Sequence, residues 1–347
     1  MTTEQINVFF LETELQALAY LSIRETLEDG SVVAPFVTLE SIYSYLQPLE
    51  PEVQFLSKKM HGWLGRIAKF RKNLAKLARG IRDKNTHPKQ INYHTARIDG
   101  LFSNLIITYL GYHFPSASIH VRLIPDGAIN IFSTQISASK SRKLLRWNKN
   151  LAARLMPDMR VLPIYGDELG ADAEVVDRIY SFNGVETSYP EHKIHRIPLL
   201  SAAAPIDQSA KKPRALVIGQ NFLQLGTADR EFVEAVADRM KVFLSAQGVE
   251  EVDYIPHPRS SYDEFFLAGY NRIARTELCS EQLIVNGKYT HVVSCYSSVL
   301  LNSKLILGAE LEVSAIGLEE FPFRDPNQCA QLKAAYDKVG IVIFPLT

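Results

Sequence analysis

A chain of 347 residues predicts about two domains, each long enough to bury a sizeable core of its own. The 38 Lys and Arg residues balance the 38 Asp and Glu residues, so the whole chain is no electrostatic partner for nucleic acid, and any charged partner must be met by a local patch. A hydrophobic content of 46% with 22% charged residues excludes disordered, collagen-like and disulfide-scaffold proteins.

The first half of the chain alternates apolar runs of strand length with amphipathic stretches of helix length. This alternation is typical of α/β units on a mostly parallel sheet. Strands are predicted over residues 6–12, 32–37 and 118–124, and a helix is predicted over residues 16–28, ahead of Gly30. After a long helical region, SNLIITYL (103–110) has the length and composition of a further apolar strand.

Residues 196–213 are rich in Pro, Ala, Ser and charge and show no periodicity, which predicts an interdomain linker. We therefore expect an N-terminal domain over residues 1–200 and a C-terminal domain over residues 201–347. The second domain repeats the alternation, with predicted strands and helices over residues 214–219, 228–247, 252–256, 274–286, 290–294 and 297–306. Open α/β sheets of this kind bind ligands at the carboxyl ends of their strands.

One predicted helix, within residues 57–84, is strongly basic. It carries ten Lys or Arg residues against a single acid, Asp83, and a continuous apolar stripe. The stripe residues are Trp63, Ile67, Phe70, Leu74, Leu77 and Ile81. The pattern fits an ordinary core-facing helix with a solvated basic face. It also fits a surface that touches an anionic glycan or the inner leaflet of a membrane.

Three scattered cysteines (Cys279, Cys295 and Cys329) suit a reducing compartment better than a disulfide framework or a zinc site. The first residues lack a basic segment followed by an apolar one, and no apolar run reaches about 18 residues. We expect a cytoplasmic protein, with peripheral contact to the inner face of the plasma membrane through the basic helix as an option.

Several common catalytic signatures are absent from the sequence. There is no phosphate loop, no Gly-x-Gly-x-x-Gly after the first strand, no His-Glu-x-x-His and no Gly-x-Ser-x-Gly. The Asp-x-Asp pair with which many sugar transferases hold a metal and a diphosphate is also missing. The absences argue against P-loop NTPases, dinucleotide dehydrogenases, zincins and α/β-hydrolases.

Two polar signals follow predicted strands. Asp126 lies between an apolar strand and Gly127, where a partly buried carboxylate suits a general base, although Asp-Gly is also a common turn. His257 follows the strand 252–256, with Pro258 fixing the backbone after it and Arg259 adding a permanent cation. An imidazole and a guanidinium at a strand end suit a phosphate, although His257 alone is equally compatible with a core or loop histidine.

Two further signals lie at the beginnings of helices. Ser297 and Ser298 begin a helix after a buried strand, where hydroxyls and free N–H groups bind anions or simply cap the helix. Glu281 lies one element earlier and could accept both hydroxyls of a ribose, although a lone helical Glu normally faces solvent.

Taken in order, these motifs resemble those of the bacterial sialyltransferases of the lipooligosaccharide sialyltransferase and polysialyltransferase type. Those families share an acidic-acidic-Gly motif, a His-Pro motif and a Ser-Ser motif. Here they correspond to Pro125-Asp126-Gly127, His257-Pro258 and Ser297-Ser298. The opening NVFFLETELQALAYLSI is similar to their first strand and helix. The resemblance implies an α/β protein of the GT-B type, with two Rossmann-like domains facing across a cleft.

The resemblance also implies a reaction, the inverting transfer of sialic acid or a related nonulosonic acid from its CMP-activated form to a glycan hydroxyl. Asp126 would be the base, His257 would protonate or stabilise the departing phosphate, Ser297 and Ser298 would hold that phosphate, and Glu281 would bind the ribose. Such enzymes need no metal and no cofactor. The acceptor would be a lipooligosaccharide or capsule precursor, and no nucleic acid is expected as a partner.

A fold-level expectation adds Gly219 and Gln220 as donor contacts, because they follow the first strand of the second domain. The sequence departs from the family pattern at Pro125, which occupies the first acidic position. Two alternatives therefore stay open. The donor is another CMP-activated acid, such as legionaminic acid, pseudaminic acid or Kdo, or the chain is a non-catalytic protein that binds glycans or nucleotides with the same fold.

Overall fold

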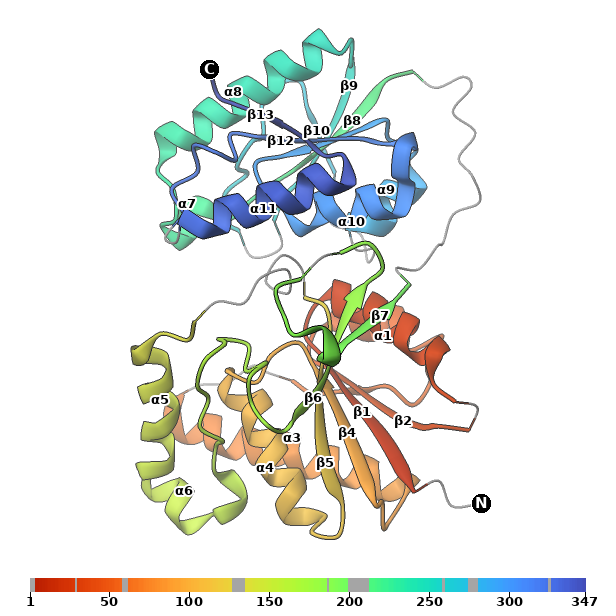
Figure 1. Ribbon diagram of the computed structural model, residues 1–347, viewed down its shortest axis with the longest axis vertical. Helices are drawn as coiled ribbons and strands as arrows, with labels where there is room; N and C mark the ends of the chain where they lie inside the picture. The colour runs from red at the N-terminus through yellow and green to blue at the C-terminus, as the bar shows by residue number, and fades with distance from the viewer. Residues whose placement is uncertain are drawn as a thin grey trace. The chain divides into compact units, whose positions relative to one another are not determined.

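The computed structural model shows two compact units built from parallel sheets and helices (Figure 1). Unit 1 comprises Met1–Asn183 and Thr187–Pro198, and unit 2 comprises Gly184–Glu186 and Leu199–Thr347. The structure describes residues 4–28, 30–57, 62–126, 135–185, 187–198, 212–257, 260–273, 280–323 and 326–347. Most of the predicted linker, together with Gly127, Pro258 and Arg259, lies outside these described residues.

Unit 1 is built on a seven-stranded sheet in the order β3-β2-β1-β4-β5-β6-β7, with every neighbouring pair parallel. Its strands are β1 (Gln5–Leu11), β2 (Val32–Val37), β3 (Gln54–Phe55), β4 (Gln90–Thr95), β5 (Ser118–Leu123), β6 (Val176–Phe182) and β7 (Ile194–Ile197). The order reverses direction between β1 and β4. In parallel sheets, such a reversal opens a crevice at the carboxyl ends of the strands.

The helices of unit 1 cover both faces of this sheet, with α3 and α4 on one side and α1 on the other (Figure 1). They are α1 (Glu14–Thr26), α2 (Glu40–Leu46), α3 (Gly62–Lys84), α4 (Leu101–His113), α5 (Ala138–Lys149) and α6 (Leu151–Leu155). The basic helix is thus confirmed as α3. Five residues of its predicted stripe, from Ile67 to Ile81, lie in the core, and the side chain of Trp63 lies outside the described part.

The sequence-based assignment of SNLIITYL to a strand is wrong, because these residues form the middle of α4. Eight of the thirteen residues of α4 are buried. A helix that is apolar nearly all round shows no amphipathic period, so its pattern cannot be told from that of a buried strand. The neighbouring strand β4 escaped prediction because Asn92, His94 and Thr95 make QINYHT look polar, although all three are buried.

Unit 2 is built on a six-stranded parallel sheet in the order β10-β9-β8-β11-β12-β13. Its strands are β8 (Arg214–Ile218), β9 (Glu251–Ile255), β10 (Asn271–Arg272), β11 (His291–Ser294), β12 (Glu312–Ile316) and β13 (Val342–Phe344). This is the doubly wound order, reversing between β8 and β11. The helices are α7 (Phe222–Leu225), α8 (Arg230–Ala246), α9 (Ser280–Gly287), α10 (Ser298–Leu307) and α11 (Pro326–Val339).

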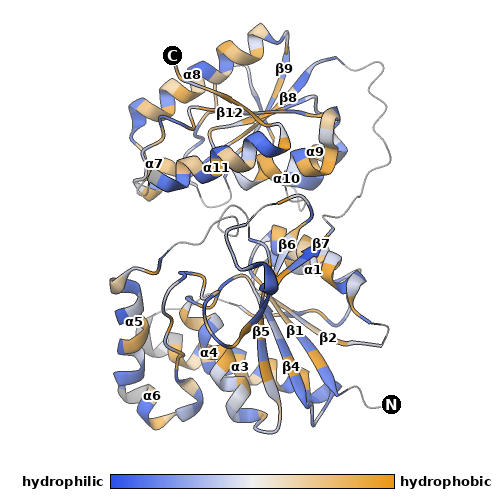
Figure 2. Cartoon of the chain, in the orientation of Figure 1, coloured by the Kyte–Doolittle hydropathy of each residue, from blue (hydrophilic) through white to orange (hydrophobic). Residues whose placement is uncertain are grey.

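The predicted α/β class is therefore confirmed, with a parallel sheet in each unit. The helices α8 and α11 each carry both apolar and polar residues (Figure 2). This is the pattern expected when helices cover a buried sheet. No helix within the described ranges combines the length and the apolar composition needed to cross a bilayer.

A buried polar row crosses the sheet of unit 1 at β4. The His94 ring is fully buried and stacks on Phe9, with the two ring centroids 4.0 Å apart. Its Nε2 lies 3.2 Å from the amide oxygen of Asn7, which places the ring hydrogen on Nε2. Burial, followed by the charges of Arg122 and Arg178, holds the pKa of His94 well below 6.5. The ring is therefore neutral in the folded protein.

Unit 1 should lose stability in mild acid because of His94. Below about pH 6.5 the unfolded chain binds a proton on His94 that the folded state does not accept, so stability falls by up to about 1.4 kcal/mol per pH unit. His94→Phe keeps a flat ring but removes this titration. Urea unfolding at about pH 7 and pH 5 should show a smaller acid loss for His94→Phe than for the wild type. An equal loss in both proteins would assign the effect to other groups.

Candidate functional site

Asp126 lies at the carboxyl edge of the unit 1 sheet, three residues after β5. Its Oδ1 accepts a hydrogen bond of 2.8 Å from the hydroxyl of Thr13. Thr13 follows β1 and is also the N-cap of α1, where its hydroxyl oxygen accepts from the Gln16 amide. Parallel pairing thus brings Asp126 to a residue more than a hundred positions away in the chain. Asp126 is half-buried, as a carboxylate that exchanges protons with a ligand should be.

A cluster of charges lies at the same edge, after β4. The carboxylate of Asp99, with 1% of its side chain exposed, forms ion pairs with Arg97 and Lys140, and Lys140 also lies 3.7 Å from Glu168. Burial alone would raise the pKa of Asp99, but hydrogen bonds and charge from Arg97 and Lys140 outweigh it and lower the pKa. The pKa of Arg97 is raised, mainly by its hydrogen bond to Asp99, and the negative charge of Asp126 contributes. Asp126 therefore lies in the field of a fixed cation.

Gly219 and Gln220 follow β8, at the reversal point of unit 2. A Cβ atom at Gly219 would lie 2.5 Å from the Tyr254 hydroxyl and 3.0 Å from the Ile255 carbonyl oxygen, so only glycine fits this close approach of β8 to β9. The Gln220 amide, 8% exposed, donates to the Ser294 hydroxyl over 3.1 Å. This bond joins the ends of β8 and β11 across the crevice.

His257 follows β9, the neighbour of β8 on the other side. It is half-buried, and its carbonyl oxygen accepts a hydrogen bond of 3.1 Å from the Ser260 amide. The predicted donor contacts Pro258 and Arg259 lie outside the described residues. Of the His-Pro motif and the Arg259 that follows it, the structure therefore places His257 alone, at the carboxyl edge of the sheet.

Ser297 and Ser298 begin α10 after β11. Ser297 is the N-cap, and its hydroxyl oxygen accepts from the Val299 amide over 3.2 Å. The backbone of Ser297 is held by Tyr336, whose hydroxyl accepts from the Ser297 amide (3.1 Å) and donates to its carbonyl oxygen (3.0 Å). Within the described residues, Ser298 has no partner for its hydroxyl or its amide. The capping role of Ser297 thus leaves Ser298 available to an anion at the positive end of a ten-residue helix.

Glu281 is buried rather than solvent-facing, with 4% exposed. It lies in the first turn of α9, and its Oε1 accepts a hydrogen bond of 2.8 Å from Asn302 of α10. Both helices begin at the carboxyl edge of the sheet, because α9 connects β10 to β11 and α10 connects β11 to β12, and all of these strands are parallel. The carboxylate therefore lies beside α10 about one turn after Ser298, and the Asn302 amide supplies a polar partner that a buried acid needs.

Sequence reasoning missed two features of this edge. The first is Glu264, which is 2% exposed and accepts hydrogen bonds of 2.8 Å from the Phe222 and Leu223 amides, and these bonds fix the beginning of α7. Burial raises the pKa of Glu264, although both hydrogen bonds favour its charged form. An aromatic cluster surrounds Tyr296, next to Ser297. Its rings belong to Phe222, Tyr296, Phe321 and Phe323. The sequence carried a signal for this cluster, because its aromatic residues come shortly after residues 214–219, 290–294 and 312–316, and each of these segments forms a strand.

Unit 2 thus brings Gly219, Gln220, His257, Ser297 and Ser298 to the ends of three adjacent strands, β9, β8 and β11. Asp126 belongs to unit 1. Among the described residues, no group of three or more His, Cys, Asp or Glu side chains is placed to hold a metal ion. The chemistry available at the unit 2 edge is a hydroxyl, N–H groups, a helix dipole and an imidazole, a combination that suits a phosphate.

Comparison with known protein families gives one match. Residues 101–311, more than half of the chain, match the family model described as alpha-2,8-polysialyltransferase (POLYST). No curated protein sequence matches the chain.

Solved structures resemble the whole chain at low sequence identity. The UDP-GlcNAc 2-epimerase from Neisseria meningitidis, bound to UDP-GlcNAc, is 10% identical over 97% of this chain and 94% of its own, with a TM-score of 0.53. The glycosyltransferase of kitacinnamycin is 11% identical over 99% of this chain and 86% of its own, with a TM-score of 0.49. The likeness to the epimerase establishes the fold alone, and the predicted two-domain α/β fold of the GT-B type is confirmed.

Removing the buried charge of Asp99 should destabilise unit 1. In Asp99→Asn, Arg97 and Lys140 lose a buried counter-ion, and the free energy of unfolding should fall by about 3–5 kcal/mol. Because the folded pKa of Asp99 is below 3.8, this contribution is complete above that pH and is lost as the pH falls through the folded pKa. Denaturant unfolding should therefore show the same deficit at about pH 7 and pH 5 and a smaller one below pH 4.

Glu168→Gln is the matched control, because it removes a carboxylate from the same cluster at a side chain that is 30% exposed. Its cost should stay below about 1 kcal/mol. Equal losses for the two variants would contradict the central role of Asp99.

Proposed function

The chain belongs to the alpha-2,8-polysialyltransferase family, and on this premise we propose that it is an inverting glycosyltransferase with a CMP-activated nonulosonic acid, typically sialic acid, as its donor. The acceptor is a hydroxyl of a surface glycan, such as a lipooligosaccharide or capsule precursor. The single observation that carries the proposal is the family match over residues 101–311. That segment contains the acidic-Gly, His-Pro and Ser-Ser motifs and every other candidate residue from Asp126 to Ser298.

The donor end of the proposed reaction uses unit 2. The reversal between β8 and β11 is where doubly wound sheets bind nucleotides. The phosphate of the donor binds at the beginning of α10, where the hydroxyl and amide of Ser298 have no partner among the described residues and Ser297 holds the helix end in place. Gln220, Gly219 and the motif of His257, Pro258 and Arg259 complete the surroundings of the nucleotide.

Glu281 is assigned to the ribose hydroxyls. Its burial and its hydrogen bond from Asn302 support this assignment, because they hold the carboxylate in one orientation. The aromatic cluster around Tyr296 gives the same edge a rigid apolar wall, which suits the flat base of a nucleotide.

The acceptor end uses Asp126 as the general base. Thr13 donates to one carboxylate oxygen and so fixes the orientation of the carboxylate. Asp126 takes the proton of the acceptor hydroxyl, and the acceptor oxygen forms its bond to the anomeric carbon as the bond from that carbon to the phosphate oxygen breaks. The electron pair leaves with CMP, whose phosphate receives a proton from His257. Attack opposite the leaving group inverts the anomeric centre.

Pro125 is the observation that favours a second candidate, a binding protein without transferase activity. It stands where the related families have their first acidic residue, so Asp126 acts one position later than the pattern suggests. The experiments below separate the two candidates. We place both in the cytoplasm, in keeping with the cysteine content and composition of the chain.

Transfer should be detected as release of CMP from CMP-sialic acid when acceptor saccharides are present. The donors to compare are the CMP derivatives of sialic, legionaminic and pseudaminic acid and of Kdo. Release from one of them identifies the sugar. Binding of CMP without release from any of these donors would refute the transferase and leave the binding protein.

Asp126 and His257 should differ in what their replacement removes. Asp126→Asn should lower kcat by about 10²- to 10⁴-fold and leave the Kd for CMP nearly unchanged, because a base contributes in the transition state. His257→Ala should lower kcat and weaken CMP binding together. Transfer by Asp126→Asn at the wild-type rate would place the base elsewhere.

Ser298→Ala should weaken CMP binding several-fold without changing the free energy of unfolding, because the Ser298 hydroxyl has no partner among the described residues. Ser297→Ala is the comparison. It should weaken binding and also cost about 1 kcal/mol of stability, because it removes a helix cap. Unchanged CMP affinity in Ser298→Ala would remove α10 from the phosphate site.

Thr13→Val should lower kcat more than it raises KM, because it removes the hydrogen bond that orients Asp126. Thr13→Ser keeps both the bond and the N-cap and should restore the wild-type rate. The same kcat in Thr13→Val and Thr13→Ser would show that Thr13 serves only as the cap of α1.

A further inference from the structure

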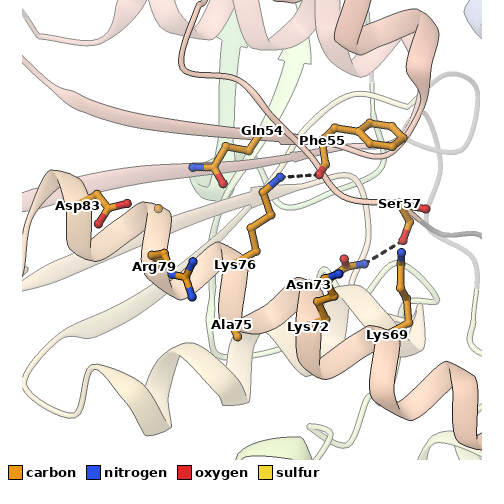
Figure 3. Close-up of a pocket in the computed structure, with 11 residues that line it drawn as sticks. Gln54, Phe55, Ser57, Lys69, Lys72, Asn73, Ala75, Lys76, Arg79 and Asp83 are labelled. Carbon is orange, nitrogen blue, oxygen red and sulfur yellow. Dashed lines mark hydrogen bonds between the residues drawn. The ribbon is translucent and has the colours of Figure 1, made fainter.

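A cavity of about 430 Å³ lies in unit 1 between α3 and the edge strand β3 (Figure 3). We call it the α3–β3 pocket. Four cations of α3 line it: Lys69, Lys72, Lys76 and Arg79. Asp83 is the one carboxylate among the described residues of its lining.

The walls of the pocket are tied together by hydrogen bonds. The Lys76 ammonium group donates to the Phe55 carbonyl oxygen over 3.0 Å, and the Asn73 amide, 6% exposed, donates to the Ser57 carbonyl oxygen over 3.1 Å (Figure 3). Both bonds join α3 to the chain at and after β3. The cations are therefore presented on a fixed surface rather than on a free helix.

Three further cations of α3 with described side chains are engaged by the protein. Arg71 contacts Met156 and lies 3.9 Å from Asp158, Arg82 lies over the Phe114 ring, and Lys84 forms an ion pair with Glu52. In contrast, Lys69, Lys72 and Arg79 have no hydrogen-bond or ion-pair partner within the described part of the chain. Among the described side chains of α3, the cations without such a partner therefore all line the pocket.

The spacing of these cations indicates the size of their partner. Lys69, Lys72, Lys76 and Arg79 follow each other at steps of three, four and three residues, so they form one row about 15 Å long. A single phosphate contacts only part of such a row. A surface that carries many phosphates matches its whole length.

The apolar side of α3 limits how such a surface is met. Ile67, Phe70, Leu74, Leu77 and Ile81 are all buried in the core of unit 1. The helix therefore cannot insert its apolar face into a bilayer as interfacial amphipathic helices do. Contact must be electrostatic and confined to headgroups, and it must weaken with salt.

We propose that the α3–β3 pocket and its row of cations form a docking site for the phosphate headgroups of an anionic lipid bilayer. The proposal does not depend on the transferase reaction. Docking through the outer side of α3 would hold unit 1 at a membrane surface.

The test uses the full chain and sedimentation with vesicles. We expect binding to vesicles of phosphatidylcholine with about one third phosphatidylglycerol, loss of binding between about 0.05 M and 0.5 M salt, and no binding to phosphatidylcholine alone. The triple variant Lys69→Gln, Lys72→Gln, Arg79→Gln should bind about a hundredfold more weakly, from roughly fivefold per cation. Circular dichroism should show an unchanged fold, because none of the three side chains has a protein partner within the described residues.

The matched control is the triple variant Lys143→Gln, Arg146→Gln, Lys149→Gln, which removes the same charge from three exposed residues of α5. It should lose no more than a few-fold in affinity. Equal losses in the two triple variants would overturn the proposal in favour of unspecific charge attraction. So would binding of inorganic phosphate or of a soluble acidic polysaccharide without binding of the anionic vesicles.

Discussion

Parallel strand pairing is the constraint on which the arrangement of this protein depends. Each unit is a sheet whose strands all run in one direction, so every strand end lies on the same edge. Thr13 and Asp126 meet across β1, β4 and β5 for this reason, although they are far apart in the sequence. Gln220 and Ser294 meet in the same way across β8 and β11. The polar residues that matter are brought together by topology rather than by proximity in the chain.

The two units place different charged or polar groups at the carboxyl edges of their sheets. Unit 1 uses ionised side chains, and the buried Asp99 is tolerated because two cations surround it. Unit 2 places a helix end at its crevice. There the cap of Ser297 and the clamp of Tyr336 fix the backbone, which leaves N–H groups and a hydroxyl for an anion without a buried cation. In the transfer that we propose, the carboxylate of unit 1 accepts a proton and the helix end of unit 2 holds a phosphate.

The helix α3 shows how one segment serves two purposes. Its stripe from Ile67 to Ile81 supplies core to unit 1, while Lys69, Lys72 and Arg79 face outward beside β3. The zero net charge of the chain conceals this separation, because acids elsewhere cancel the cations of α3. Local charge, and not the total, determines which surface an anionic partner meets.

The sequence by itself determined the α/β class and, in unit 2, the strands β8, β9 and β11 and the helices α8, α9 and α10, because runs such as RALVI and HVVS alternate with amphipathic helices. It also named Asp126, His257 and Ser297 as candidates, and the structure places each of them just after a strand. It failed at α4 and β4, where burial removes the periodic pattern of a helix and hides polar residues inside a strand.

Only the tertiary structure decided which polar groups have partners. It showed that Glu281 is buried against Asn302 and that Thr13 holds Asp126. Among the described residues, it also showed that Ser298 has no partner where Ser297 is engaged, and that the α3 cations without a partner line one pocket. The physical reason is that periodicity and motifs record the local demands of the backbone. Hydrogen bonds and ion pairs between distant residues depend on strand order and register, which no local pattern encodes.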